Sequence, residues 1–174
     1  MMKVLNNEEA MSWCSERGFA VKARPHYSDD RIGKGISFLT AAKQSSVAAF
    51  VRTFVNDADF DEATVWLTDW PFYQPDEMAV VMRLRASIDE TRWLIDAPAH
   101  VFERQERDDC VGLFNLCVQY GWDAFLFIPR SQLLLYNSHD DIQYVSSSSA
   151  EVVAGAARLL GLFDLTVRTS PPPA

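Results

Sequence analysis

Apolar side chains recur with helical spacing in five segments of the chain. The clearest is the second, where Val47, Phe50, Val51 and Phe54 follow an i, i+3, i+4, i+7 pattern after a capping serine at Ser45 or Ser46. One face of this helix should therefore be buried. The other four helices are predicted over residues 7–17, from Pro75 onward, over 105–120 and from Ser148 onward.

Residues that favour helix ends support these assignments. Asn6 with Glu9 and Ser148 with Glu151 have the spacing of a capping box, in which each side chain bonds the other residue's backbone N–H. Gly18 and Gly121 follow the last apolar position of their segments, where glycine commonly ends a helix.

Strands are predicted where apolar and polar residues alternate or where β-branched and aromatic residues cluster. Residues 19–24 and 36–40 flank the polar loop 25–35 and predict a hairpin with a long connection. Further strands are predicted over 64–68, 122–128, 133–136 and 142–145, whereas residues 89–104 give no clear pattern.

The order of these elements predicts an α+β fold with two layers (α/β two-layer). Two hairpins indicate a mixed, largely antiparallel sheet, and the intervening helices, about five, should cover one face. The length of 174 residues suits one domain, which we place at 1–168. The proline-rich tail 169–174 is expected to be disordered.

The charge and amino-acid composition of the chain argue against several classes of function. The net charge of −8 and pI near 4.8 disfavour binding to nucleic acid or to anionic membranes, which both require clustered basic residues. No apolar run approaches the length of a membrane span, and the N-terminus does not resemble a signal peptide. With three cysteines, an odd number, these features predict a reduced cytoplasmic protein.

No familiar catalytic motif is present. The chain lacks a phosphate loop, a dinucleotide-binding glycine pattern and a G-x-S-x-G nucleophile elbow. Cys110 and Cys117 lie about two helical turns apart, roughly 10 Å, which is too far to share one zinc ion without other ligands. We therefore expect structural thiols, no metal and no cofactor, and the sequence favours a protein that is not an enzyme.

Two polar loops nevertheless contain histidine and paired aspartates. The first has His26 with Asp29 and Asp30, and the second has His139 with Asp140 and Asp141. If both loops lie at the same end of the sheet, these six side chains could form a metal site or a general acid/base pair. If they do not, both are ordinary solvated turns.

The interval between Arg52 and Arg83 has no lysine or arginine but seven carboxylates and six large aromatic residues. Its aromatic loop could fold back as a lid on the core, or it could anchor a basic partner surrounded by steering carboxylates. In the second case the partner-binding residues would be Asp59, Asp61, Glu62, Asp69, Trp70, Phe72, Tyr73 and Asp76.

Three functional hypotheses follow. The first is a non-catalytic acidic binding module that recognises a basic protein partner, as an inhibitor or immunity protein would. The second is a metal-assisted hydrolase that uses the His26 and His139 loops. The third is a structural subunit whose aromatic surface is buried in a homodimer or larger homo-oligomer.

Overall fold

The computed structural model describes residues 2–21, 25, 35–39, 44–70 and 75–168, and these confirm the predicted α+β class. The helices in this part of the chain are α1 (Asn7–Glu16), α2 (Gln44–Asp57), α3 (Pro75–Ala86), α4 (Arg107–Tyr120) and α5 (Ala150–Leu162), with a short 3-10 turn at Arg104–Glu106. The strands are β1 (Lys3–Leu5), β2 (Gly35–Leu39), β3 (Glu62–Asp69), β4 (Ala99–Glu103), β5 (Asp123–Ile128), β6 (Leu133–Asn137), β7 (Ile142–Ser147) and β8 (Val167–Arg168).

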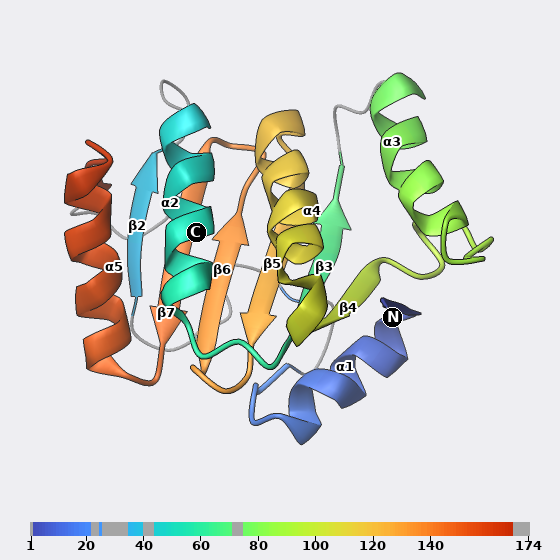
Figure 1. The fold of residues 1–174 in the computed structure, drawn as a ribbon, viewed down its shortest axis with the longest axis horizontal. Coiled ribbons are helices and arrows are strands. Elements are labelled where there is room, and N and C mark those ends of the chain that lie inside the picture. The colour runs from blue at the N-terminus through green and yellow to red at the C-terminus, as the bar shows by residue number, and fades with distance from the viewer. Residues whose placement is uncertain (1, 22–24, 26–34, 40–43, 71–74, 169–174) are drawn as a thin grey trace.

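The strands form one sheet with the order β1-β4-β3-β5-β6-β7-β2-β8, and every pairing between the described strands is antiparallel (Figure 1). The three strands β5, β6 and β7 are consecutive in the chain and in the sheet. Strand β3 joins β5 from the other side, so residues far apart in the sequence lie on neighbouring strands.

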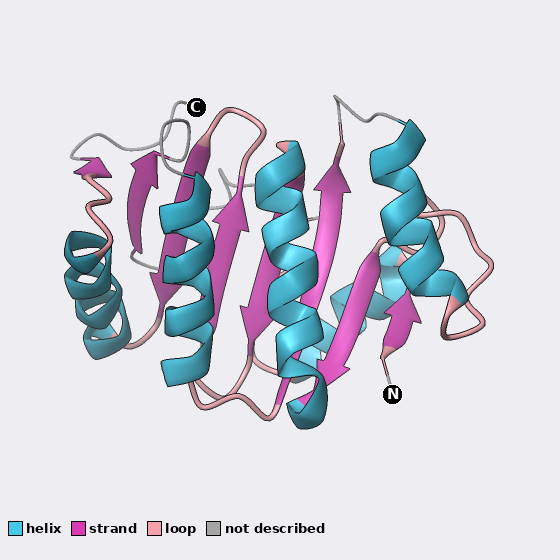
Figure 2. Ribbon diagram, turned by 45° about the horizontal axis from the view of Figure 1, so that its top comes forward, coloured by secondary structure: helices cyan, strands magenta, loops and turns pink. Residues whose placement is uncertain are grey.

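Side chains are buried on both faces of the sheet. The larger core lies under α2, α4 and α5, which pack against one face, and α3 adds Val81 to the same cluster (Figure 2). A smaller cluster on the opposite face contains Trp13 and Cys14 of α1 together with Trp66 of β3 and Phe125 of β5. Helix α1 therefore covers the face that the other helices leave free.

Several local predictions are confirmed. Asn6 caps α1, and its side chain and that of Glu9 each accept the other's backbone N–H at 2.9 and 2.8 Å. The apolar stripe of α2 is buried, and Phe50 is fully inaccessible. Gly121 ends α4 with a positive φ of 63°, the left-handed conformation that suits glycine.

Other predictions need correction. Residues 19–21 form no strand, and β2 pairs with β7 and β8, so the described part of the hairpin predicted from 19–24 and 36–40 is not paired as expected; residues 22–24 and 40 lie outside the described residues. Ser149 caps α5 rather than Ser148. Strands β1, β4 and β8 were not predicted. The tail 169–174 lies outside the described residues.

Strand β4 is hard to recognise in the sequence because it contains His100, a polar residue that is buried in contact with Arg85. Arg85 and His100 are both fully buried, and one guanidinium nitrogen of Arg85 lies 3.2 Å from Nε2 of His100 and donates to the carbonyl of Ala97. Burial, followed by the charge of Arg85, lowers the pKa of His100 to about 3. This histidine is therefore neutral and structural, not a candidate acid or base.

The three thiols are free and buried, as expected for structural cysteines. Burial raises the pKa of Cys14 to about 12 and raises the pKa of Cys110 and Cys117 further. Within the described residues, no helix has the length and apolar character that crossing a membrane requires.

Candidate functional site

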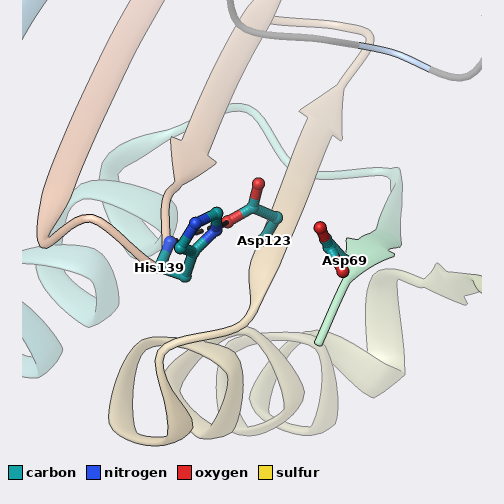
Figure 3. Close-up of side chains that lie close together, drawn as sticks. All are labelled: Asp69, Asp123 and His139. Carbon is teal, nitrogen blue, oxygen red and sulfur yellow. Dashed lines mark hydrogen bonds and ion pairs between the residues drawn. The ribbon is translucent and has the colours of Figure 1, made fainter. Parts of the chain in front are cut away.

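Three polar side chains meet at one end of the sheet. Asp69 is the last residue of β3 and pairs with Asp123, the first residue of β5, across an irregularity in the ladder after Leu67. His139 lies in the turn that follows β6, the other neighbour of β5. One ligand atom from each residue lies within 4.8 Å of the others, with Asp123 in the middle (Figure 3).

Asp123 organises this cluster through its hydrogen bonds. Its Oδ1 accepts the backbone N–H of His139 at 2.7 Å and lies 2.8 Å from Nδ1 of the same residue. Its Oδ2 accepts the hydroxyl of Tyr136 at 3.0 Å. Because both oxygens are engaged, Asp123 fixes the orientation of the imidazole, which is how a carboxylate beside a catalytic or metal-binding histidine commonly acts.

The charges around His139 favour its protonated form. Burial alone would lower its pKa, but the hydrogen bond to Asp123 and the charges of Asp123, Asp140 and Asp69 together raise the pKa above its ordinary value. Nε2 lies 3.6 Å from a carboxylate oxygen of Asp140. Each of the two ring nitrogens of His139 therefore has a carboxylate beside it.

The turn that carries His139 is anchored beneath the surface. Asn137, at the end of β6, is buried and donates to the carbonyls of Cys117 at 3.2 Å and Trp122 at 2.6 Å. The buried Gln143 of β7 donates in turn to Asn137. Asp141 closes the turn at a φ of 61°, which aspartate tolerates better than most residues. These contacts tie the position of His139 to the end of α4.

The other end of β3 is electrostatically different. Asp59 pairs with Arg130 at 2.5 Å, Asp61 pairs with Arg104 and Arg130, and Glu62 pairs with Arg17 at 2.5 Å. Hydrogen bonds from Arg104 and Arg130 lower the pKa of Asp61. The carboxylates between Arg52 and Arg83 therefore fall into two groups. Asp59, Asp61 and Glu62 have arginine partners from other segments, whereas Asp69 lies at the opposite end of the strand.

The aromatic loop, which contains Trp70, Phe72 and Tyr73, is described by the structure only at Trp70. Trp70 is half-buried and packs against the larger core, which supports the lid interpretation for this ring. Its backbone N–H donates to Asp69 at 2.8 Å. Phe72 and Tyr73 lie outside the described residues. Asp76 is exposed in the first turn of α3, and the start of α3 lies at the same end of the sheet as the end of β3 (Figure 1).

The predicted convergence of the two histidine loops is not tested, because His26, Asp29 and Asp30 lie outside the described residues. The structure instead brings His139 to Asp123 and Asp69. Sequence reasoning missed Asp123, because this residue stands inside the apolar run 122–128 and was assigned only to a strand. A single carboxylate at the start of an otherwise apolar strand was the available signal.

We refer to Asp69, Asp123, His139 and Asp140 together as the acidic end. This arrangement can attract a cation, and its imidazole can gain or lose a proton near neutral pH. Two grooves lined by described residues, with volumes of about 610 and 360 Å³, include none of these four side chains. No protein-family model matches the chain, nor does any curated protein or solved structure.

Proposed function

We propose that the protein is a non-catalytic acidic binding module and that its acidic end receives a basic side chain of a protein partner. The observation that carries the proposal is the contrast between the two ends of β3. Asp59, Asp61 and Glu62 pair with arginines of the same chain. Among the described residues, the ion pairs of Asp123 and Asp140 go only to His139.

The charge balance of the acidic end supports this proposal. Three carboxylates surround one imidazole, so the four groups carry a net charge of −2 when His139 is protonated and −3 when it is neutral. Carboxylates held this close repel one another, and a lysine or arginine from outside relieves that repulsion. The net charge of −8 on the whole chain also speeds the approach of a basic partner.

The same geometry gives the proposed binding a definite pH dependence. Protonated His139 supplies an internal positive charge that competes with the partner's cation for the carboxylates. Because the pKa of His139 is raised, the imidazole stays protonated, and keeps competing for the carboxylates, at pH values above the ordinary histidine pKa. Affinity for the basic partner should therefore increase as the pH rises through the pKa of His139.

A metal-assisted hydrolase is the second candidate, and the specific observation in its favour is the ligand set. One imidazole and two carboxylates within 4.8 Å are donors that zinc or manganese accepts. Metal binding requires a neutral imidazole, whereas the carboxylates around His139 raise its pKa and favour its protonated form. A lysine or arginine can bind the carboxylates without removing that proton, which makes an external basic side chain the better fit.

Affinity capture from a lysate of the native cells tests the proposal when two variants with equal charge change are compared. The first, Asp69→Asn with Asp140→Asn, removes two charges from the acidic end. The matched control, Asp59→Asn with Asp61→Asn, removes two charges from the other end, where both carboxylates form exposed ion pairs, which contribute little to stability. We expect wild type and the control to retain one basic protein, identified by mass spectrometry, and the first variant to lose it.

Three outcomes would count against the proposal. Equal loss of the captured protein in both variants would indicate attraction by net charge alone. Retention by the first variant would place the binding surface elsewhere. Failure of the wild type to capture a basic protein, together with stoichiometric binding of Zn²⁺ or Mn²⁺ by calorimetry, would favour the hydrolase instead.

A further inference from the structure

Helix α5 leaves much of its apolar surface uncovered. It is rich in alanine, valine and leucine, yet only Ala156 and Leu160 are buried. Leu162 is 78% exposed, the largest exposed fraction among the large hydrophobic residues that the structure describes as exposed. The helix lies at the border of the helical layer, beside α2 (Figure 1). Val152 and Leu159 pack partly against the larger core, so the uncovered apolar surface consists of exposed alanines, the half-buried Val153 and Leu162. Apolar surface gathered on one exposed helix can mark an interface.

A groove of about 610 Å³ runs between α2 and α5. Its apolar lining includes Phe54 of α2, Leu133 of β6 and Leu159 of α5, and its margin includes Glu151 and Arg158. The groove therefore offers an apolar floor with charges of both signs on the same helix. Within the described part of the chain, Glu151 and Arg158 take part in no ion pair with each other or with another residue.

The outward residues of α5 have the spacing of a helix–helix seam. Glu151, Gly155, Arg158 and Leu162 follow one another at intervals of four, three and four residues, so they lie along one stripe. Gly155 has no side chain, and among the described residues beyond its chain neighbours and its own helix backbone, the atom nearest the position of its missing Cβ is Nη2 of Arg158, at 3.8 Å. A second helix can therefore approach α5 closely once the flexible arginine turns aside.

The charges on this stripe are complementary to those of a second α5 helix that runs in the opposite direction. Glu151 and Arg158 lie four residues before and three residues after Gly155. A two-fold axis beside Gly155 runs two α5 helices antiparallel, and it places Glu151 of each copy beside Arg158 of the other. An interface with two-fold symmetry requires this self-complementarity. Leu162, seven residues after Gly155, then lies opposite position 148 of the other copy, just before the start of its α5.

We propose that the face formed by α5 and the α2–α5 groove is a homodimer interface, with Glu151 and Arg158 forming two symmetric ion pairs across it. The acidic end belongs to a different part of the molecule, at the ends of β3 and β6. Self-association through α5 is therefore a property separate from the proposed binding of a basic partner.

Charge reversal with the full-length protein gives a decisive test. Glu151→Arg places two arginines together at each contact, and Arg158→Glu places two glutamates together. Each variant alone should have a dimer dissociation constant at least about tenfold higher than wild type in sedimentation equilibrium. An equimolar mixture of the two variants should form a heterodimer, because each contact then joins arginine to glutamate again.

Controls exclude a loss of folding or a general effect of net charge. Arg52→Glu changes the charge on the exposed side of α2 by the same amount as Arg158→Glu and should leave the dissociation constant unchanged. Leu162→Ser should weaken the dimer without changing the circular dichroism spectrum. A wild-type protein that stays monomeric at all accessible concentrations would overturn the proposal, as would two charge variants that dimerise as wild type does or fail to associate when mixed.

Discussion

Asp123 holds His139 by two hydrogen bonds to a single carboxylate oxygen, one from the backbone N–H at 2.7 Å and one with the ring Nδ1 at 2.8 Å. The backbone bond fixes the turn, and the ring bond fixes the direction of the imidazole. The turn after β6 and the start of β5 are therefore coupled through one side chain.

Replacing Asp123 with asparagine should lower the pKa of His139. The amide can still accept the backbone hydrogen bond, but it removes the negative charge nearest to Nδ1. Proton NMR titration of the imidazole would measure the change, with His139→Gln used to assign the signal. His100 does not interfere, because its pKa of about 3 keeps it neutral over this range. An unchanged pKa would contradict the geometry.

The contribution of His139 to stability should depend on pH with a definite sign. Its pKa is raised in the folded protein above the unfolded value of about 6.5, so its charged interactions contribute fully below that value and are lost as the pH rises through the folded pKa. The difference in unfolding free energy between wild type and His139→Gln should therefore be larger at about pH 5.5 than at about pH 8.5. Urea denaturation at both values measures it, and the opposite trend would refute the assignment.

Phe50→Ala should destabilise the protein by about 3–5 kcal/mol, the usual cost of truncating a buried phenylalanine. Phe50 is fully buried and its ring contacts those of Phe38 and Phe54 at centroid distances of 5.2 and 5.4 Å. The midpoint of denaturant unfolding would measure the loss. A midpoint equal to that of wild type would show that the stripe of α2 does not contribute to the core.

Trp70→Ala should reduce stability by a smaller amount, about 1–3 kcal/mol, because its ring is only half-buried against the core. Thermal and urea unfolding would report this loss. If the substitution instead left stability unchanged but abolished capture of the basic partner, the ring would belong to the binding surface and not to the lid.

All three thiols should react slowly in the native protein. Cys14, Cys110 and Cys117 are inaccessible, and burial keeps each thiol protonated. Mass spectrometry after treatment with a maleimide should detect labelling only when denaturant is present. Rapid labelling of native protein at any of the three positions would show that the helix carrying it opens.

Local signals in the sequence were sufficient where the structure is decided by neighbours in the chain. The cap of α1 depends on Asn6 and Glu9, which lie three residues apart, and the end of α4 depends on Gly121. The buried stripe of α2 follows from its 3.6-residue period. These features needed no knowledge of the rest of the fold.

The candidate site could not be predicted in the same way, because it depends on strand order. Asp69 and Asp123 are 54 positions apart, and only the pairing of β3 with β5 brings them together. Strand β4 escaped prediction for a related reason: His100 occupies a fully buried position that its polarity argues against, and Arg85, fifteen residues earlier, contacts its ring.

The division of charge along β3 has a consequence for how the protein can be altered. Glu62 and Asp69 are seven residues apart on an extended strand, roughly 23 Å at about 3.3 Å per residue. That separation is nearly three times the screening length of about 8 Å at physiological salt. Substitutions at the two ends should therefore act additively. The arginine-paired end can be modified for solubility or for attachment to a surface while the other end keeps its electrostatic environment.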